Sequence, residues 1–249
     1  MAHNIYEEFR DFSAETRRLE EFEFPLFVTQ AVLPQDQIHG YRFCDIGAGP
    51  DIKTQLYVEN SGGTYIPVDR RPDFMEQRKL KSKQFFVAEA TSLPFADCSI
   101  DICHMRFVLM HLLPELQIHA IRECLRCARR ITTFIEYDWI TFEGPPLVNA
   151  IRDELISRLS QKMDFFIGRR LEKTITPLVG RGKELITKEF SREYGNYRHE
   201  LLPLLDSAIG ILGDKSGTLK TLRPALVSAD ASAISFSPPT VISVTVRGR

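Results

Sequence analysis

The sequence predicts an α/β fold in which a mostly parallel sheet is covered on both faces by helices, a doubly wound arrangement. Three observations predict it. Short apolar segments alternate with helical segments between residues 41 and 145, the first of them runs into a glycine-rich turn, and a further alternating segment lies near the C-terminus. The chain has 249 residues, of which 43% are hydrophobic and 26% charged, and this suits a single domain spanning residues 1–249.

The elements follow in order along the chain. Five apolar segments are expected to form parallel strands, at residues 43–46, 64–68, 84–88, 100–105 and 131–137. Helical patterns are expected between them, at residues 52–60, 70–83, 107–113 and 116–130. Beyond Pro145 and Pro146 the pattern predicts a long helical segment, a strand, a helix and a closing strand, at residues 147–176, 184–193, 201–212 and 240–246. The sheet should therefore have seven strands, the C-terminal one antiparallel, and the first 30 residues should form amphipathic helices.

The charge and cysteine content restrict the classes of function. Thirty-two basic and 33 acidic residues give a formal net charge of −1, so the totals favour neither nucleic acid nor an anionic membrane as a partner. No apolar run approaches the roughly 20 residues of a membrane span, and the first residues lack a secretion-signal pattern, so we expect a cytoplasmic protein. Cys124 and Cys127 form a CxxC pair, but it lies in a predicted helix without a second pair, so we expect buried thiols and no metal site.

A glycine-rich turn between the first strand and helix is the first candidate for a binding site. Gly47 and Gly49 allow close approach of a ligand to the backbone, and Asp69, 20 residues after Gly49, ends the second strand, where a carboxylate can bind ribose hydroxyls. Taken singly, the glycines suit a plain turn and Asp69 a helix cap. Together they indicate an adenosine-containing ligand. A dinucleotide site would need a third glycine where Ile52 stands, whereas the Asp45 carboxylate favours the cationic S-adenosylmethionine.

The order of motifs resembles that of the class I S-adenosylmethionine-dependent methyltransferases, in particular the type 11 and type 25 group that acts on small molecules. The matching elements are Asp45–Gly49, Asp69, Glu89–Phe95 and Ser99–Leu112. The resemblance covers residues 40–145 and implies a Rossmann-like fold. One departure concerns Asp51, which stands where many relatives carry a third glycine.

The resemblance also implies roles for individual residues. It implies S-adenosylmethionine as cofactor, S-adenosylhomocysteine as product, and cofactor binding by Asp45, Gly47, Ala48, Gly49, Asp69, Arg70, Glu89, Ala90, Met105 and Arg106. Glu136, Asp138 and Trp139 close the fifth strand at the edge where ligands bind in open α/β sheets, so we expect them to face the acceptor. His111 is either a packed histidine or a catalytic base.

These roles divide the chain into four parts. Residues 1–40 are expected to be a helical cover, 41–145 the cofactor-binding core, 146–180 a helical lid insertion, and 181–249 the part that completes the sheet. The expected activity is in-line transfer of a methyl group to a small-molecule acceptor, including specialised metabolites, by a monomer or homodimer. The motif for amino methylation of adenine is absent after the fourth strand, and nucleic acid is disfavoured as a partner. An RNA or protein methyltransferase and a non-methylating protein of the same fold are the alternatives.

Overall fold

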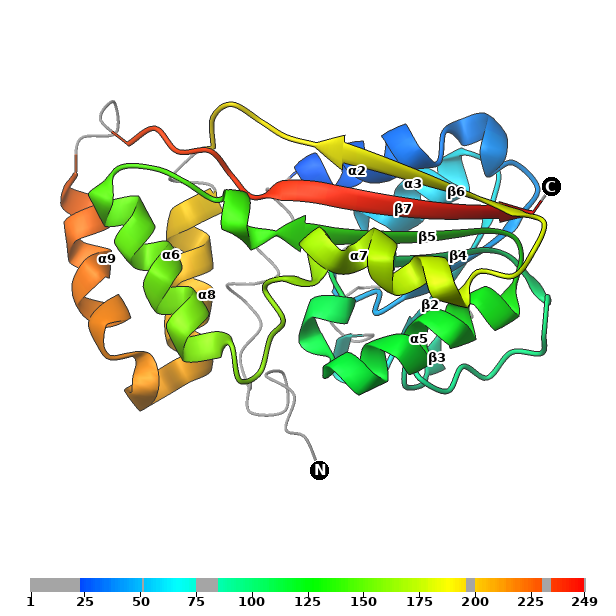
Figure 1. The fold of residues 1–249 in the computed structure, drawn as a ribbon, viewed down its shortest axis with the longest axis horizontal. Coiled ribbons are helices and arrows are strands. Elements are labelled where there is room, and N and C mark those ends of the chain that lie inside the picture. Colours follow the sequence, from blue (N-terminus) through cyan, green and yellow to red (C-terminus); the bar gives the residue numbers. More distant parts are fainter. Residues whose placement is uncertain (1–22, 51, 75–84, 196–199, 230–233, 249) are drawn as a thin grey trace.

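A seven-stranded sheet forms the centre of the protein. The structure is a computed structural model that describes residues 23–50, 52–74, 85–195, 200–229 and 234–248. The strand order is β3-β2-β1-β4-β5-β7-β6, with helices on both faces of the sheet (Figure 1). The predicted fold class is therefore confirmed.

The strands run as the apolar segments predict. The five parallel strands are β1 (Arg42–Ile46), β2 (Thr64–Asp69), β3 (Phe86–Val87), β4 (Ile100–Arg106) and β5 (Ala128–Asp138). The two remaining strands, β6 (Lys183–Phe190) and β7 (Thr240–Gly248), are antiparallel to each other, and β7 is also antiparallel to β5. Most residues of β1, β2 and β4 are buried, as expected for parallel strands covered on both faces.

The register of the parallel strands brings the predicted motifs to one edge of the sheet. Ile46, the last residue of β1, is paired with Val68 on one side and with Met105 on the other. Parallel strands end at a common edge, so the residues that follow these positions, including Gly47 and Asp69, lie together there.

Alternating side chains of the strands pack on opposite faces of the sheet. Phe43, Tyr65 and Ile102 pack with α3 (Lys53–Asn60) on one face. The intervening residues face the other side, where the larger core includes side chains of α5 and α7. Their bounds are Pro114–Cys127 for α5 and Ile167–Ile175 for α7. The helix α2 (Phe24–Val32) packs on α3 and β7.

Three helices form a cap beyond the carboxyl ends of the parallel strands. The helical cap consists of α6 (Pro146–Leu159), α8 (Leu202–Leu212) and α9 (Thr218–Ser228), and α9 packs against both of the others. Figure 1 shows the cap at the end of the sheet towards which β5 runs. The sequence did not predict α9, which contains Pro224 in its interior.

The predicted single helical segment over residues 147–176 is wrong. The chain leaves the cap after Leu159 and begins α7 at Ile167. Between them the amide of Asp164 donates a hydrogen bond of 2.7 Å to the carbonyl of Met110. The helix α7 then packs on β5, where a side chain at Gly168 would come within 2.3 Å of the Tyr137 carbonyl oxygen. Only the first part of the expected lid insertion therefore lies in the cap.

Smaller corrections concern the ends of elements. The helix α5 ends at Cys127, because the next residues already belong to β5, and the expected helical run at 107–113 is a single 3-10 turn at Leu109–His111. The expected helices within residues 1–22 and 75–83, and Asp51, lie outside the described residues. Within the described ranges, no helix combines the length and apolar character that a membrane span requires.

Candidate cofactor and acceptor site

A cavity of about 270 Å³ lies at the carboxyl edge of the sheet and extends beneath the helical cap. Residues of the core and of the cap both line it. Of the expected cofactor-binding residues, eight line this cavity: Gly47, Ala48, Gly49, Asp69, Arg70, Glu89, Ala90 and Arg106. His111 and Trp139 also line it. The structure thus brings together most of the residues that the sequence singled out.

The glycine loop turns sharply over the end of β2. Gly47 and Gly49 have positive φ angles of 69° and 55°, in the left-handed region that glycine adopts without strain. The amides of Gly47 and Ala48 donate hydrogen bonds of 2.8 and 3.1 Å to the carbonyl of Val68. A Cβ atom at Gly47 would lie 2.4 Å from Cγ2 of Val108, so the loop and the turn after β4 are closely packed.

The Asp69 carboxylate ties this loop to the end of β2. Its Oδ2 accepts a hydrogen bond of 2.9 Å from the amide of Gly49, and its Oδ1 accepts one of 3.0 Å from the amide of Arg71. Arg71 in turn binds Asp73 and lies over the ring of Phe74, with 5.3 Å between the guanidinium carbon and the ring centroid. The Asp69 carboxylate therefore fixes the backbone at the end of the cavity that contains the glycine loop.

Two expected cofactor-binding residues do not line the cavity. Asp45 is buried at the end of β1, and its Oδ2 accepts a hydrogen bond of 2.6 Å from the hydroxyl of Tyr65. Met105 is fully buried in the larger core, because its side chain points to the α5 face of the sheet. Neither side chain lines the cavity, so neither is placed for a direct contact with a ligand.

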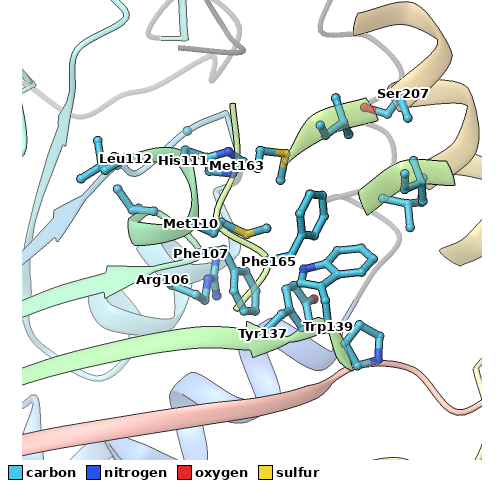
Figure 2. A pocket seen from close by; sticks show the side chains of 18 of the residues that line it. Arg106, Phe107, Met110, His111, Leu112, Tyr137, Trp139, Met163, Phe165 and Ser207 are labelled. Carbon is cyan, nitrogen blue, oxygen red and sulfur yellow. The ribbon is translucent and has the colours of Figure 1, made fainter. Parts of the chain in front are cut away.

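Aromatic rings form the other part of the cavity lining. The rings of Phe107 and Tyr137 are stacked, with 4.0 Å between centroids and 6° between planes. Trp139 meets Tyr137 and Phe165 edge to face at 5.9 and 5.4 Å. Figure 2 shows these rings beside Met110, His111 and Met163. This end of the cavity can hold an apolar group close to the carboxyl ends of β4 and β5.

His111 ends the 3-10 turn that follows β4. Glu136 holds this turn from below, since its Oε1 accepts hydrogen bonds of 2.9 and 2.7 Å from the amides of Val108 and Leu109. Glu136 is completely buried, and this burial raises the pKa of its carboxyl group to about 8. It was expected to face the acceptor, but it is not among the lining residues and instead supports the turn that carries His111.

Asp138 also differs from its expected place. Its carboxylate pairs with Arg169 of α7 at 3.2 Å and accepts a hydrogen bond of 3.3 Å from the amide of Ile140. It does not line the cavity. Of the three residues expected to face the acceptor, only Trp139 lines the cavity, because successive side chains at a strand end point in different directions.

The lining chemistry suits a ligand that combines an adenosine with a charged amino acid. Carboxylates at Asp69 and Glu89 can accept hydrogen bonds from hydroxyl and amino groups, and Gly47 and Gly49 bring no side chain of their own to the cavity lining. Residues 44–135 match the family model described as a methyltransferase domain. Residues 44–135 thus form a methyltransferase domain of the kind that uses S-adenosylmethionine. Its cofactor is S-adenosylmethionine, and its reaction is methyl transfer.

Solved structures share the fold of this methyltransferase. The YcgJ protein of Bacillus subtilis is 17% identical, with a TM-score of 0.61 over 92% of this chain and 100% of the other. A protein of Anabaena variabilis, described as a methyltransferase from an antibiotic biosynthesis pathway, is 14% identical, with a TM-score of 0.62 over 88% and 96%. An S-adenosylmethionine-dependent methyltransferase of Thermotoga maritima is 13% identical, with a TM-score of 0.59 over 98% of both chains. Among curated proteins, no sequence relative of the chain is found.

Several lining residues of the methyltransferase were not singled out from the sequence. Phe107 directly follows Arg106 at the end of β4, and a rule that includes every residue at a strand's carboxyl end would have found it. Phe165 and Phe236 lie in connecting segments far apart in the chain, and no local pattern marks them.

Proposed function

We propose that this methyltransferase transfers the methyl group to a small molecule enclosed between the sheet and the helical cap. The observation that carries the proposal is the continuity of the cavity. It is lined by the glycine loop and Asp69, and also by buried side chains of the cap such as Leu155 and Ala208. An acceptor seated there would lie beside the cofactor and be largely withdrawn from water.

The proposed role of the protein is to align the acceptor with the cofactor and to exclude water. When bound, S-adenosylmethionine provides an electrophilic methyl group on a positively charged sulfur. We assign to Asp69 and Glu89 the binding of the adenosine part and to Arg106, at the end of β4, a position beside the methionine part. The aromatic side chains exclude water and hold the acceptor in line with the methyl group.

His111 is the proposed proton acceptor for an acceptor that must lose a proton. It lines the cavity on the turn after β4. Its turn is fixed by the Glu136 carboxyl group, which restricts where the imidazole can lie. General-base assistance of this kind typically contributes 10²- to 10⁴-fold in rate.

The division of the chain remains part of the proposal in a revised form. Residues 41–145 are proposed to bind the cofactor. The helical cap, rather than residues 146–180 alone, is proposed as the lid, because Leu155, Leu204 and Ala208 line the cavity whereas α7 packs on the sheet.

Transfer of a labelled methyl group tests the function directly. The purified protein is incubated with methyl-labelled S-adenosylmethionine and, separately, with small-molecule, RNA and protein fractions of a cell extract, with Asp69→Ala as the inactive control. We expect label in the small-molecule fraction only. Label confined to RNA or protein would favour that alternative acceptor class, and S-adenosylhomocysteine binding without transfer to any fraction would favour a non-methylating role.

A further inference from the structure

Six aromatic side chains form a continuous wall in the part of the cavity that faces the cap. This aromatic wall consists of Phe107, Tyr137, Trp139, Phe142, Phe165 and Phe236. Neighbouring rings lie between 4.0 and 5.9 Å apart, centroid to centroid. The residues come from the ends of β4 and β5, from the link between α6 and α7, and from the segment before β7. Separate parts of the chain thus bring rings to one place, and Figure 2 shows Phe107, Tyr137, Trp139 and Phe165 there.

The backbone at Phe107 is held in an unfavourable conformation within this wall. Its φ angle is +57°, a left-handed value that is uncommon for a residue with a bulky side chain. The conformation is held by a hydrogen bond of 2.8 Å from the Phe107 amide to the carbonyl of Ile135, and it leaves the ring parallel to Tyr137. The geometry favours a site in which the faces and edges of the rings matter.

One pair of oppositely charged side chains near the wall is engaged in mutual hydrogen bonds. Arg192 and Glu200 both line the cavity and form two hydrogen bonds of 2.8 and 2.5 Å. The Arg192 guanidinium also lies over the ring of Phe24, at 4.4 Å from its centroid. A charged acceptor would lose its hydration against the aromatic wall. Its charge could then be neutralised only if the ion pair of Arg192 and Glu200 opened.

We propose that the acceptor is a neutral molecule with a planar ring, which packs against Trp139 and Phe165 of the aromatic wall. This inference rests on the proposed transfer to a small molecule and specifies its substrate class. Aromatic pairs prefer stacked or edge-to-face geometries, and the wall presents both. Ring faces also attract cations, so a charged ammonium is the competing occupant that the test must separate.

Trp139 is the only tryptophan of the chain, and its emission therefore reports on the wall alone. The protein is saturated with S-adenosylhomocysteine and titrated with four probes that differ in charge and shape: benzyl alcohol, benzylammonium, benzoate and hexan-1-ol. We expect benzyl alcohol to change the Trp139 emission in a saturable way and to bind at least about fivefold more tightly than each of the others. Tighter binding of benzylammonium or benzoate would overturn the neutral acceptor, and equal binding of hexan-1-ol would overturn the ring.

Two neighbouring phenylalanines provide the matched variants. Phe165 is 2% exposed and lines the cavity, whereas Phe166 is 42% exposed and does not. Phe165→Leu keeps an apolar side chain and removes the ring, so it should weaken benzyl alcohol about fivefold while Phe166→Leu leaves it unchanged. Equal effects of the two variants would show that the probe binds outside the wall.

The labelled-methyl experiment separates this inference from the function on which it rests. Label in the small-molecule fraction combined with preferred binding of a charged probe would refute the neutral ring-bearing acceptor and leave the proposed function standing. Label in RNA or protein would refute the proposed function, whichever probe binds. Binding of S-adenosylhomocysteine, measured by calorimetry, confirms in both cases that the variants are folded.

Discussion

The amide of Gly49 donates a hydrogen bond of 2.9 Å to the carboxylate of Asp69, and this bond joins the glycine loop after β1 to the end of β2. The other oxygen of the carboxylate accepts a hydrogen bond of 3.0 Å from the amide of Arg71. The orientation of the carboxylate is therefore fixed by two backbone groups. A group that is already in place for a ligand loses little further freedom on binding, which favours affinity.

Two substitutions of Asp69 should weaken cofactor binding to different degrees. Asp69→Asn preserves the shape but removes the charge and places an amide donor beside backbone donors, so the Kd for S-adenosylhomocysteine should rise about tenfold. Asp69→Ala also releases the loop and should raise it about a hundredfold, since hydrogen bonds to charged groups are worth roughly 1.5–3 kcal/mol. Calorimetric titration measures both, with the exposed Asp36→Ala as control. Unchanged affinity in Asp69→Ala would remove this residue from the site.

Gly47→Ala should destabilise the fold and the site together. The added methyl group would lie 2.4 Å from the Val108 side chain, and the φ angle of +69° is strained for alanine. We expect a loss of about 2 kcal/mol in the free energy of unfolding, measured by urea denaturation, and weaker binding of S-adenosylhomocysteine. Gly180→Ala is the matched control, because nothing lies within 4 Å of its added methyl group. An equal loss in both variants would contradict the importance of the contact with Val108.

The cofactor half of the site was predictable because its parts are local in the sequence. Strands buried on both faces are continuous apolar runs, and parallel strands end at one edge, so Gly47 and Asp69 could be placed together without a structure. What could not be predicted was which neighbours at a strand end face the cavity. Glu136, Asp138 and Trp139 all close β5, yet only Trp139 lines the cavity, because the first two bind backbone amides or Arg169.

The cap was less predictable because its helices are brought together only by tertiary contacts. The helices α6 and α9 pack against each other although α7 and β6 lie between them in sequence. The helix α7 packs on the sheet and not in the cap, and Gly168 allows this because it lets the helix approach the Tyr137 carbonyl closely. A single glycine within a helical pattern does not predict such a contact. The sequence pattern therefore predicted helices in this region correctly, but it did not predict that the segment is divided into α6 and α7.

The stability of the protein should fall with rising pH because of Glu136. Burial raises the pKa of its carboxyl group from the ordinary value of 4.5 to about 8, so between these pH values the folded state holds a proton that the unfolded state has already released. The contribution of the neutral form is fully present below about pH 4.5 and is lost as the pH rises through about 8. Its size is on the order of a few kcal/mol.

Glu136→Gln isolates this contribution. Glutamine keeps a carbonyl oxygen for the amides of Val108 and Leu109 but does not titrate. The stability of the variant protein should therefore change less over the same pH range. The measurement is urea denaturation of the two proteins at pH 5, pH 7 and pH 9, chosen to bracket the pKa of about 8. Parallel pH profiles would show that the carboxyl group of Glu136 does not retain its proton in the folded state.

His111→Gln should reduce turnover without reducing cofactor affinity. The imidazole is the group proposed to take a proton from the acceptor, and glutamine retains polarity and length but cannot act as a base near neutral pH. With a hydroxyl-bearing acceptor that the labelling experiment identifies, we expect kcat to fall by about 10²-fold or more and the acid limb of the pH profile of kcat to disappear. The exposed His119→Gln is the control. If His111→Gln kept full kcat and the same pH profile, the imidazole would be a packed residue of the turn, and the proton would leave by way of water.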